Sequence, residues 1–147
     1  MDTSANRQVD VLLAKYAESH LNPTNELIHI VCIPAIVFSF LGLLWALHPL
    51  AALGLTLASL VYYFRLSVPF AFGMLLMSGA MLWILSVLPQ DEVLAVSLVV
   101  FVIAWIGQFI GHKIEGKKPS FFDDLRFLLI GPLFVLSFLY RRFHIAY

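Results

Sequence analysis

The stretch LIHIVCIPAIVFSFLGLLWALHPLAALGLTLASLVYYF, residues 27–64, contains no Asp, Glu, Lys or Arg over 38 positions. A helical membrane span needs about 20 apolar residues, so this stretch is long enough for two. Proline suits the first turn of a helix, and Pro49 therefore predicts a turn at Leu47-His48-Pro49 with a second span after it. The stretch predicts an all-α, polytopic membrane protein.

The rest of the chain continues this pattern. Its other long uncharged gaps cover residues 66–90, 93–112 and 127–140, with 25, 20 and 14 residues. The first two predict a third span that ends near Leu88-Pro89 and a fourth from about Glu92 to His112. The last gap is short and carries Gly131-Pro132 in its middle, which favours a short re-entrant or interfacial helical segment over a fifth span.

The composition agrees with a membrane helical bundle. The 147 residues are 61% hydrophobic and 12% charged, whereas soluble domains average about 45–50% apolar and about 25% charged residues. These values exclude a typical soluble enzyme, a disordered chain and a disulfide scaffold. The net charge of zero gives no basic field for nucleic acid, and the single Cys32 cannot form an intramolecular bridge. We expect one membrane-embedded domain over residues 1–147.

Basic residues set the expected orientation, because they gather on the cytoplasmic side of membrane proteins. With four spans and both termini inside, all nine Lys and Arg lie inside, and only Asp91 and Glu92 lie outside. A fifth span would move Arg141 and Arg142 outside. The first 26 residues contain no apolar signal segment. We expect a bacterial inner membrane, or the endoplasmic-reticulum membrane in a eukaryote, with the site at the cytoplasmic face.

An amphipathic surface helix is predicted before the first span. Its apolar stripe follows helical spacing through Val9, Leu12, Leu13, Tyr16 and His20. Pro23 disfavours helical geometry in the residue before it and so separates this helix from the first span. Thr24 or Asn25 is expected to cap that span.

Three histidines meet at one membrane boundary in this topology. His20 ends the surface helix, His29 lies just inside the first span, and His112 ends the fourth. Residues on one face of the fourth span, at spacings of 3, 4 and 3, are Trp105, Gln108, His112 and Glu115. Polar groups at membrane depth normally face the bundle interior and mark function, so we expect a divalent metal site here. His48, in the opposite turn, and His144, in the tail, are interpreted as structural.

The residue types leave several chemistries open. Neutral imidazole binds iron, zinc, copper or nickel, and three His or two His with one carboxylate leave positions open, as non-haem Fe(II) oxygenases require. A di-iron site needs more carboxylates than this end supplies. A zinc-dependent lipid hydrolase is one alternative. A non-enzymatic lipid-binding or transport protein is another, although no Asp or Glu lies inside the predicted spans to couple ion transport.

Two polar blocks resemble a known family of small membrane proteins. The first block follows the pattern Tyr16, His20, Asn22, Asn25 and His29, with Pro34 in the next span. The second block runs from Trp105 to Glu115 and continues with Lys118-Pro119 and Gly131-Pro132-Leu133. This pattern resembles the family of the yeast endoplasmic-reticulum 2-hydroxy fatty acid dioxygenase of phytosphingosine breakdown. The resemblance spans nearly the whole chain.

The resemblance implies an Fe(II)-dependent dioxygenase that converts a 2-hydroxy fatty acid and O2 into a fatty acid one carbon shorter and CO2. The implied catalytic and metal-binding residues are His20, His29, His112 and Glu115. The polar residues implied to orient the imidazoles by hydrogen bonds are Asn22, Asn25 and Gln108. Lys113 or Arg126 is expected to pair with the substrate carboxylate. The chain departs from the family pattern at Phe121-Phe122-Asp123-Asp124, which leaves the roles of the two acids open.

Overall fold

The computed structural model describes residues 7–117 and 127–147 of the chain. Within these ranges the chain forms six helices and no strand. The helices are α1 (Gln8–Ala17), α2 (Pro23–Leu47), α3 (Pro49–Leu66), α4 (Val68–Val87), α5 (Gln90–Glu115) and α7 (Ile130–Arg142). The predicted all-α architecture is confirmed.

Four of the described helices, α2 to α5, are long and apolar enough to span a membrane. They contain 18 to 26 residues, which matches the about 20 that a bilayer core requires. Helix α7 has only 13 residues, and its first eight, residues 130–137, are buried against the spans. The prediction of four spans followed by a short helical segment is confirmed.

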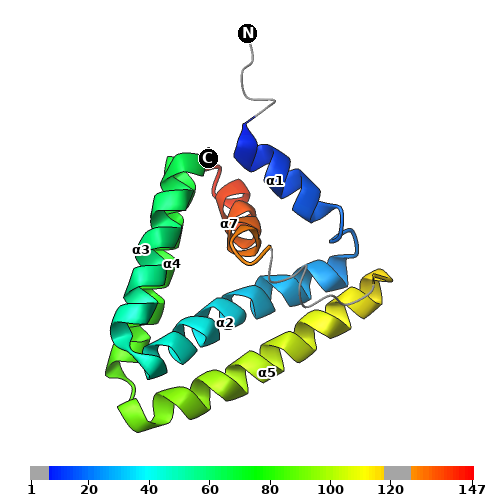
Figure 1. The fold of residues 1–147 in the computed structure, drawn as a ribbon. Coiled ribbons are helices and arrows are strands. Elements are labelled where there is room, and N and C mark those ends of the chain that lie inside the picture. The colour runs from blue at the N-terminus through cyan, green and yellow to red at the C-terminus, as the bar shows by residue number, and fades with distance from the viewer. Residues whose placement is uncertain (1–6, 118–126) are drawn as a thin grey trace.

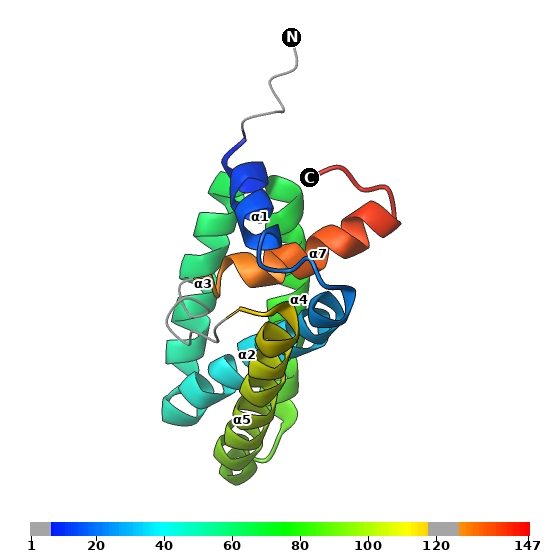
Figure 2. The same ribbon diagram turned by 90° about the vertical axis from the view of Figure 1, so that its right-hand side faces the viewer.

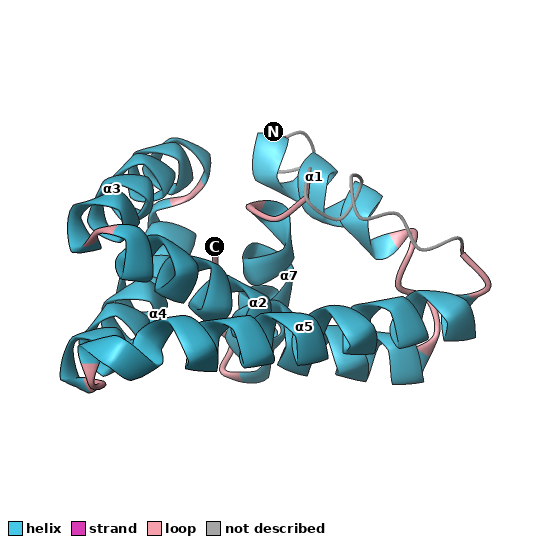
Figure 3. Ribbon diagram, turned by 60° about the horizontal axis from the view of Figure 1, so that its bottom comes forward, coloured by secondary structure: helices cyan, strands magenta, loops and turns pink. Residues whose placement is uncertain are grey.

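The spans are arranged as two pairs (Figure 1). Helix α2 runs beside α5, and α3 packs on α4 (Figure 1, Figure 3). The pairs meet at one corner, where α2 turns into α3 and α4 into α5, and they diverge from it (Figure 1). Helices α1 and α7 occupy the opposite, open side, near the C-terminus (Figure 1, Figure 2). The fold therefore has a corner end and an open end.

Single residues make the two sharpest connections. His48 joins α2 to α3, and its side chain accepts a hydrogen bond from the backbone N–H of Leu50 at 3.1 Å. Ser67 joins α3 to α4 and accepts one from Phe70. Pro49 occupies the first turn of α3, where its missing N–H costs no hydrogen bond. The predicted turn at residues 47–49 is confirmed.

Two local predictions before the first span are wrong. Helix α1 ends at Ala17, so His20 lies in the connection to α2 and not on the amphipathic helix. The helix stops there because the N–H groups of Ser19 and His20 bond three residues back, in a tighter turn. The cap of α2 is Asn22, whose Oδ1 accepts from the Thr24 N–H at 2.9 Å, and neither Thr24 nor Asn25 takes that place. Pro23 explains this cap, since its fixed φ suits the first helical position.

Helices α2 and α5 approach closely because glycines face side chains of the neighbouring helix. A Cβ added to Gly107 would lie 2.5 Å from the sulfur of Cys32. A Cβ added to Gly111 would collide with Asn25 Oδ1 and lie 3.1 Å from the ring of His29. Small residues allow such close packing between membrane helices. Gly107 and Gly111 lie four residues apart on the same face of α5. They allow the last turns of α5 to pack directly against the polar start of α2.

Candidate metal centre at the open end

The three histidines come from three different segments and meet at the open end. His20 lies in the α1–α2 connection, His29 in the second turn of α2, and His112 in the last turn of α5. Their ring centroids are 4.3 Å apart for His20 and His29, 5.0 Å for His29 and His112, and 6.2 Å for His20 and His112. All three side chains are buried. The expected meeting of these histidines at one end of the bundle is therefore present in the structure.

Backbone carbonyls fix the orientation of two of the rings. His20 Nδ1 lies 2.7 Å from the Tyr16 carbonyl oxygen, and His29 Nδ1 lies 2.9 Å from that of Asn25. A carbonyl only accepts hydrogen bonds, so each Nδ1 carries the proton, and in neutral imidazole the lone pair is then on Nε2. Metal-binding histidines have this arrangement, with the other ring N–H donated to a carbonyl or carboxylate.

Aromatic side chains from α1 and α7 enclose the cluster. The Tyr16 ring stacks on His20, with centroids 4.3 Å apart and an interplanar angle of 10°. Phe134 of α7 lies against both rings, 4.9 Å from Tyr16 and 5.4 Å from His20. Phe134 has no sequence signal that predicts this place, because only the fold brings α7 to this end. These rings separate His20 from solvent on one side.

Glu115 ties the α1–α2 connection to the end of α5. Its Oε1 accepts the Leu21 N–H at 3.0 Å, and its Oε2 accepts the Asn22 N–H at 2.8 Å and Asn25 Nδ2 at 3.0 Å. The carboxylate also lies near the amino terminus of α2, where negative charge is favourable. With three N–H donors on its two oxygens, Glu115 is placed to hold His20 beside His29.

The predicted orienting residues have different surroundings. Asn22 caps α2. Asn25 is fully buried and donates from Nδ2 to the Ser19 carbonyl at 3.2 Å as well as to Glu115. Gln108 is also buried, and a void of about 10 Å³ lies between it, Tyr16 and neighbouring side chains of α2 and α7. Asn25 thus lies directly beside His29 and Glu115, whereas Gln108 lines a small void together with Tyr16.

The predicted carboxylate-binding residues are not joined to the cluster. Lys113 is exposed in the last turn of α5. Arg126, like Asp123 and Asp124, lies outside the described residues. The structure instead brings the carboxyl end of α7 close to His20. An open pocket of about 780 Å³ lies there, and its polar lining residues are His20, Glu26, Arg141, Arg142 and His144. In the sequence the two arginines indicate only topology, because their juxtaposition with His20 depends on how α7 folds back.

Three buried polar atoms at this end have no hydrogen-bond partner in the described part of the chain. They are His29 Nε2, Asn25 Oδ1 and Gln108 Oε1. Such atoms are rare, and an ion or water at the site is one physical reason for them. One of them, Asn25 Oδ1, faces Gly111, where a Cβ would collide with it.

The donor types at this end fit a first-row metal, but the side chains do not converge on one point. Within residues 7–117 and 127–147, no group of three His, Cys, Asp or Glu is positioned to hold a metal ion. Bonds of about 2.1 Å from three imidazole nitrogens to one ion would place the ring centroids about 5 Å apart. The observed separations of 4.3–6.2 Å bracket this value, and the side chains would have to reorient to converge on one ion.

Together, the fold and this end of it define a class: an all-helical protein with four helices long and apolar enough to span a membrane and a buried histidine cluster at the open end. Residues 7–143 match the model of a family described as 2-hydroxy-palmitic acid dioxygenase Mpo1-like. The chain is 31% identical over 140 residues to the 2-hydroxy-palmitic acid dioxygenase MPO1 of Saccharomyces cerevisiae. The alignment covers 88% of this chain and 78% of the yeast protein. The chain belongs to the Mpo1-like family. No solved structure matches it.

Proposed function

We propose that this protein is a dioxygenase that cleaves 2-hydroxy fatty acids and uses Fe(II) held by His20, His29 and His112. The observation that carries the proposal is the cluster of three buried imidazoles, two of which donate Nδ1–H to backbone carbonyls and present Nε2 to the interior. Family membership supports the substrate class, since the yeast relative is named for 2-hydroxy-palmitic acid.

The proposed reaction balances without a further co-reactant. A 2-hydroxy fatty acid and O2 give a fatty acid one carbon shorter, CO2 and water. The C1–C2 bond breaks, C2 is oxidised to the new carboxyl group, and O2 is reduced. Bound Fe(II) would supply the activation of O2 and the coordination of the hydroxyl and carboxylate oxygens of the substrate.

The remaining polar residues position the histidines in this proposal. Glu115 holds the connection that carries His20, because it accepts from the N–H groups of Leu21 and Asn22. Asn25 supplies the carbonyl that orients His29. We therefore propose a positioning role for Glu115 in place of the ligand role that the resemblance allowed. Pairing of the substrate carboxylate with Lys113 or Arg126 stays a prediction.

A membrane boundary suits an amphiphilic substrate. The charged head of the fatty acid can meet the histidines while its tail remains among apolar helices. Burial of each methylene contributes about 0.8 kcal/mol, so a long tail is strongly retained on the apolar side. The four candidate spans supply that apolar surface.

The test uses the purified full-length chain in lipid nanodiscs, loaded with Fe(II) under anaerobic conditions. On addition of 2-hydroxypalmitate and O2, we expect O2 uptake and CO2 release in equal amounts, with a C15 fatty acid as product. His48→Ala is the matched control, because it removes a histidine from the other end of α2. Turnover without O2, or folded iron-loaded protein that consumes no O2, would contradict the proposal.

We also propose that the open end faces the cytosol. Arg65 and Lys113 lie in the last turns of α3 and α5, at that end, whereas Asp91 and Glu92 lie in the first turn of α5 at the corner. Cytoplasmic ends of spans carry the excess of basic residues. A membrane-impermeant maleimide should label Glu92→Cys but not Lys117→Cys in intact cells, and the reverse pattern would refute this orientation. The choice between a bacterial inner membrane and the endoplasmic reticulum stays a prediction.

A further inference from the structure

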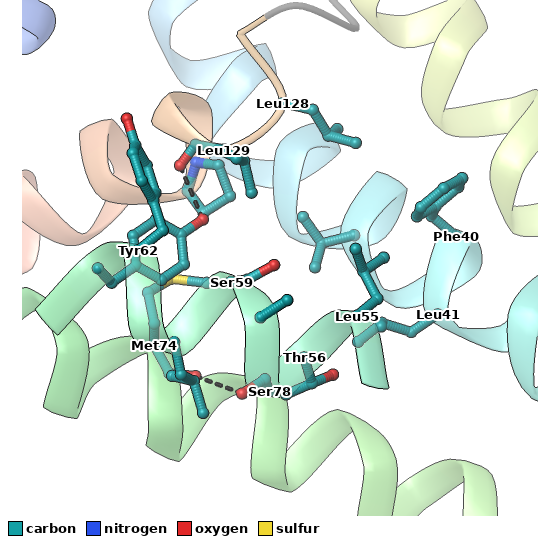
Figure 4. A pocket seen from close by; sticks show the side chains of 15 residues that line it. Phe40, Leu41, Leu55, Thr56, Ser59, Tyr62, Met74, Ser78, Leu128 and Leu129 are labelled. Carbon is teal, nitrogen blue, oxygen red and sulfur yellow. Dashed lines mark hydrogen bonds between the residues drawn. The ribbon is translucent and has the colours of Figure 1, made fainter. Parts of the chain in front are cut away.

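An apolar pocket lies in the angle between the two pairs of spans. It has a volume of about 440 Å³ and is formed by α2, α3, α4 and the residues that begin α7 (Figure 4). Side chains that line it include Phe40, Leu55, Ser59, Tyr62 and Leu128. Its volume is about three times that of a ~150 Å³ apolar cavity that binds benzene, which is room for an acyl chain on the order of fifteen carbons.

Three of the five hydroxyl groups in the pocket lining donate hydrogen bonds within the protein. Thr56 Oγ1 donates to the Ala52 carbonyl at 2.8 Å, and Ser78 Oγ donates to the Met74 carbonyl at 2.6 Å. Tyr63 Oη donates to the Leu129 carbonyl at 2.8 Å. Because these donors are already used, the lining offers an occupant mainly apolar contact. A hydrocarbon chain fits these walls, whereas a polar ligand would lose its hydrogen bonds to water.

The pocket shares one lining residue with a small void that lies next to Tyr16. Leu128 lines both the pocket and the small void beside Tyr16 and Gln108. On the same turn, a Cβ added to Gly131 would lie 3.3 Å from Tyr16 Oη, so α7 passes very close to this ring. Tyr16 in turn stacks on His20. Leu128, the small void and Tyr16 thus lie in order between the apolar pocket and His20.

The far side of the cluster has the opposite character. His20 there borders the open pocket lined by Arg141, Arg142 and His144, with Glu26 as the acidic member. The open pocket beside His20 is thus basic, whereas the pocket beyond Tyr16 and Leu128 is apolar. An anionic amphiphile of extended shape complements both, with its charged head toward α7's carboxyl end and its tail toward α3 and α4.

We propose that the apolar pocket between α2, α3, α4 and the start of α7 binds the acyl chain of the 2-hydroxy fatty acid and limits its length. This inference rests on the proposed function for the identity of the substrate. Ser59 is half-buried and lies in the pocket wall on α3. A larger side chain at this position would shorten the space for the acyl chain.

Photolabelling tests the pocket without requiring turnover. The probe is 2-hydroxypalmitate with a diazirine at its methyl end, bound to the full chain in nanodiscs under anaerobic conditions. We expect cross-links on pocket residues of α3 and α4, such as Leu55, Ser59 and Met74, that unlabelled 2-hydroxypalmitate competes away. Labelling confined to the outer face of α5, at Val99, Val102 and Ile106, would overturn the proposal.

A chain-length profile gives the second test. Ser59→Phe should lower kcat/KM for the C16 substrate at least about tenfold relative to the C10 substrate, because it fills the pocket. The matched control is Ser86→Phe on α4, whose serine is exposed and outside the pocket lining, and which should leave the C16/C10 ratio unchanged. An equal loss for both chain lengths in Ser59→Phe would refute the pocket. Labelling of the pocket in a protein that never consumes O2 would refute the dioxygenase function and support the pocket as an acyl-chain site. Turnover with labelling elsewhere would support the dioxygenase function and refute the pocket.

Discussion

Helix α2 carries a histidine near each end, and the two have opposite environments. His29, at the open end, is buried, and its Nδ1 donates to a backbone carbonyl. His48, at the corner, is exposed, and its Nδ1 accepts the Leu50 N–H as a helix cap. The ring nitrogen that remains is therefore an acceptor at His29 and an N–H donor at His48. One residue type on one helix can be a metal ligand at the first end and a structural cap at the second.

The largest expected difference between the two ends of α2 appears when each histidine ring is removed in turn. His29→Ala should abolish iron binding and reduce kcat/KM by more than the about 10–100-fold typical of residues that only support a metal ligand. His48→Ala should retain both, since its loss affects only the α3 cap. Steady-state kinetics on both variants, with circular dichroism to check folding, measures the difference. Equal losses in the two variants would remove the distinction between the ends.

Acidic residues at the two ends of α5 give the next largest contrast. Glu115→Gln keeps the shape of the side chain but weakens the hydrogen bonds from Leu21, Asn22 and Asn25. Because these bonds position His20, we expect a loss of about 10–100-fold in iron affinity. Glu92→Gln, at the corner, should change it little. Anaerobic iron titration measures both, and unchanged affinity in Glu115→Gln would show that the positioning role is wrong.

Two glycines differ in how tightly their surroundings are packed, Gly111 at the open end of α5 and Gly54 on α3. Gly111→Ala would place a Cβ against Asn25 Oδ1 and the His29 ring, and overpacking of this kind costs about 1–3 kcal/mol. In the described part of the chain, nothing lies within 4 Å of a Cβ added to Gly54 on α3, so Gly54→Ala should be neutral or stabilise the helix by up to about 1 kcal/mol. Thermal unfolding in nanodiscs compares the two. A Tm for Gly111→Ala at or above that of Gly54→Ala would contradict the close approach of α2 and α5.

The smallest expected effect concerns the cap of α2. Asn22→Ala removes the acceptor for the Thr24 N–H and should lower the free energy of unfolding by about 1 kcal/mol. Asn22→Ser should restore most of it, because serine is an equally good cap. A thermal shift of the alanine variant that serine does not reverse would mean that Asn22 acts through something other than capping.

The sequence was sufficient to predict the spans and the meeting of three histidines at one end of the bundle. Four spans follow from the spacing of charged residues, because a membrane tolerates few charges over the length of a helix. The turn at His48 follows from Pro49. The meeting of His20, His29 and His112 follows from alternating span directions, which place the start of α2 and the end of α5 together.

Side-chain partners between distant segments could not be predicted. Periodicity extended the apolar stripe of α1 to His20, but the helix ends at Ala17, where hydrogen bonds tighten to three-residue spacing. Helical spacing placed Glu115 on the same face as His112, yet its partners Leu21 and Asn22 are more than 90 residues away. The basic pocket at Arg141 depends likewise on the return of α7 to His20.

Iron content provides the most direct test of the histidine cluster as the metal centre. The full-length chain and its His29→Ala and His48→Ala variants would be expressed under iron-replete conditions, purified without chelator and analysed for metal. We predict about one iron per chain in the unmodified protein and in His48→Ala, and almost none in folded His29→Ala. Equal iron in all three proteins, or none in the unmodified one, would contradict the assignment of the open end as an iron site.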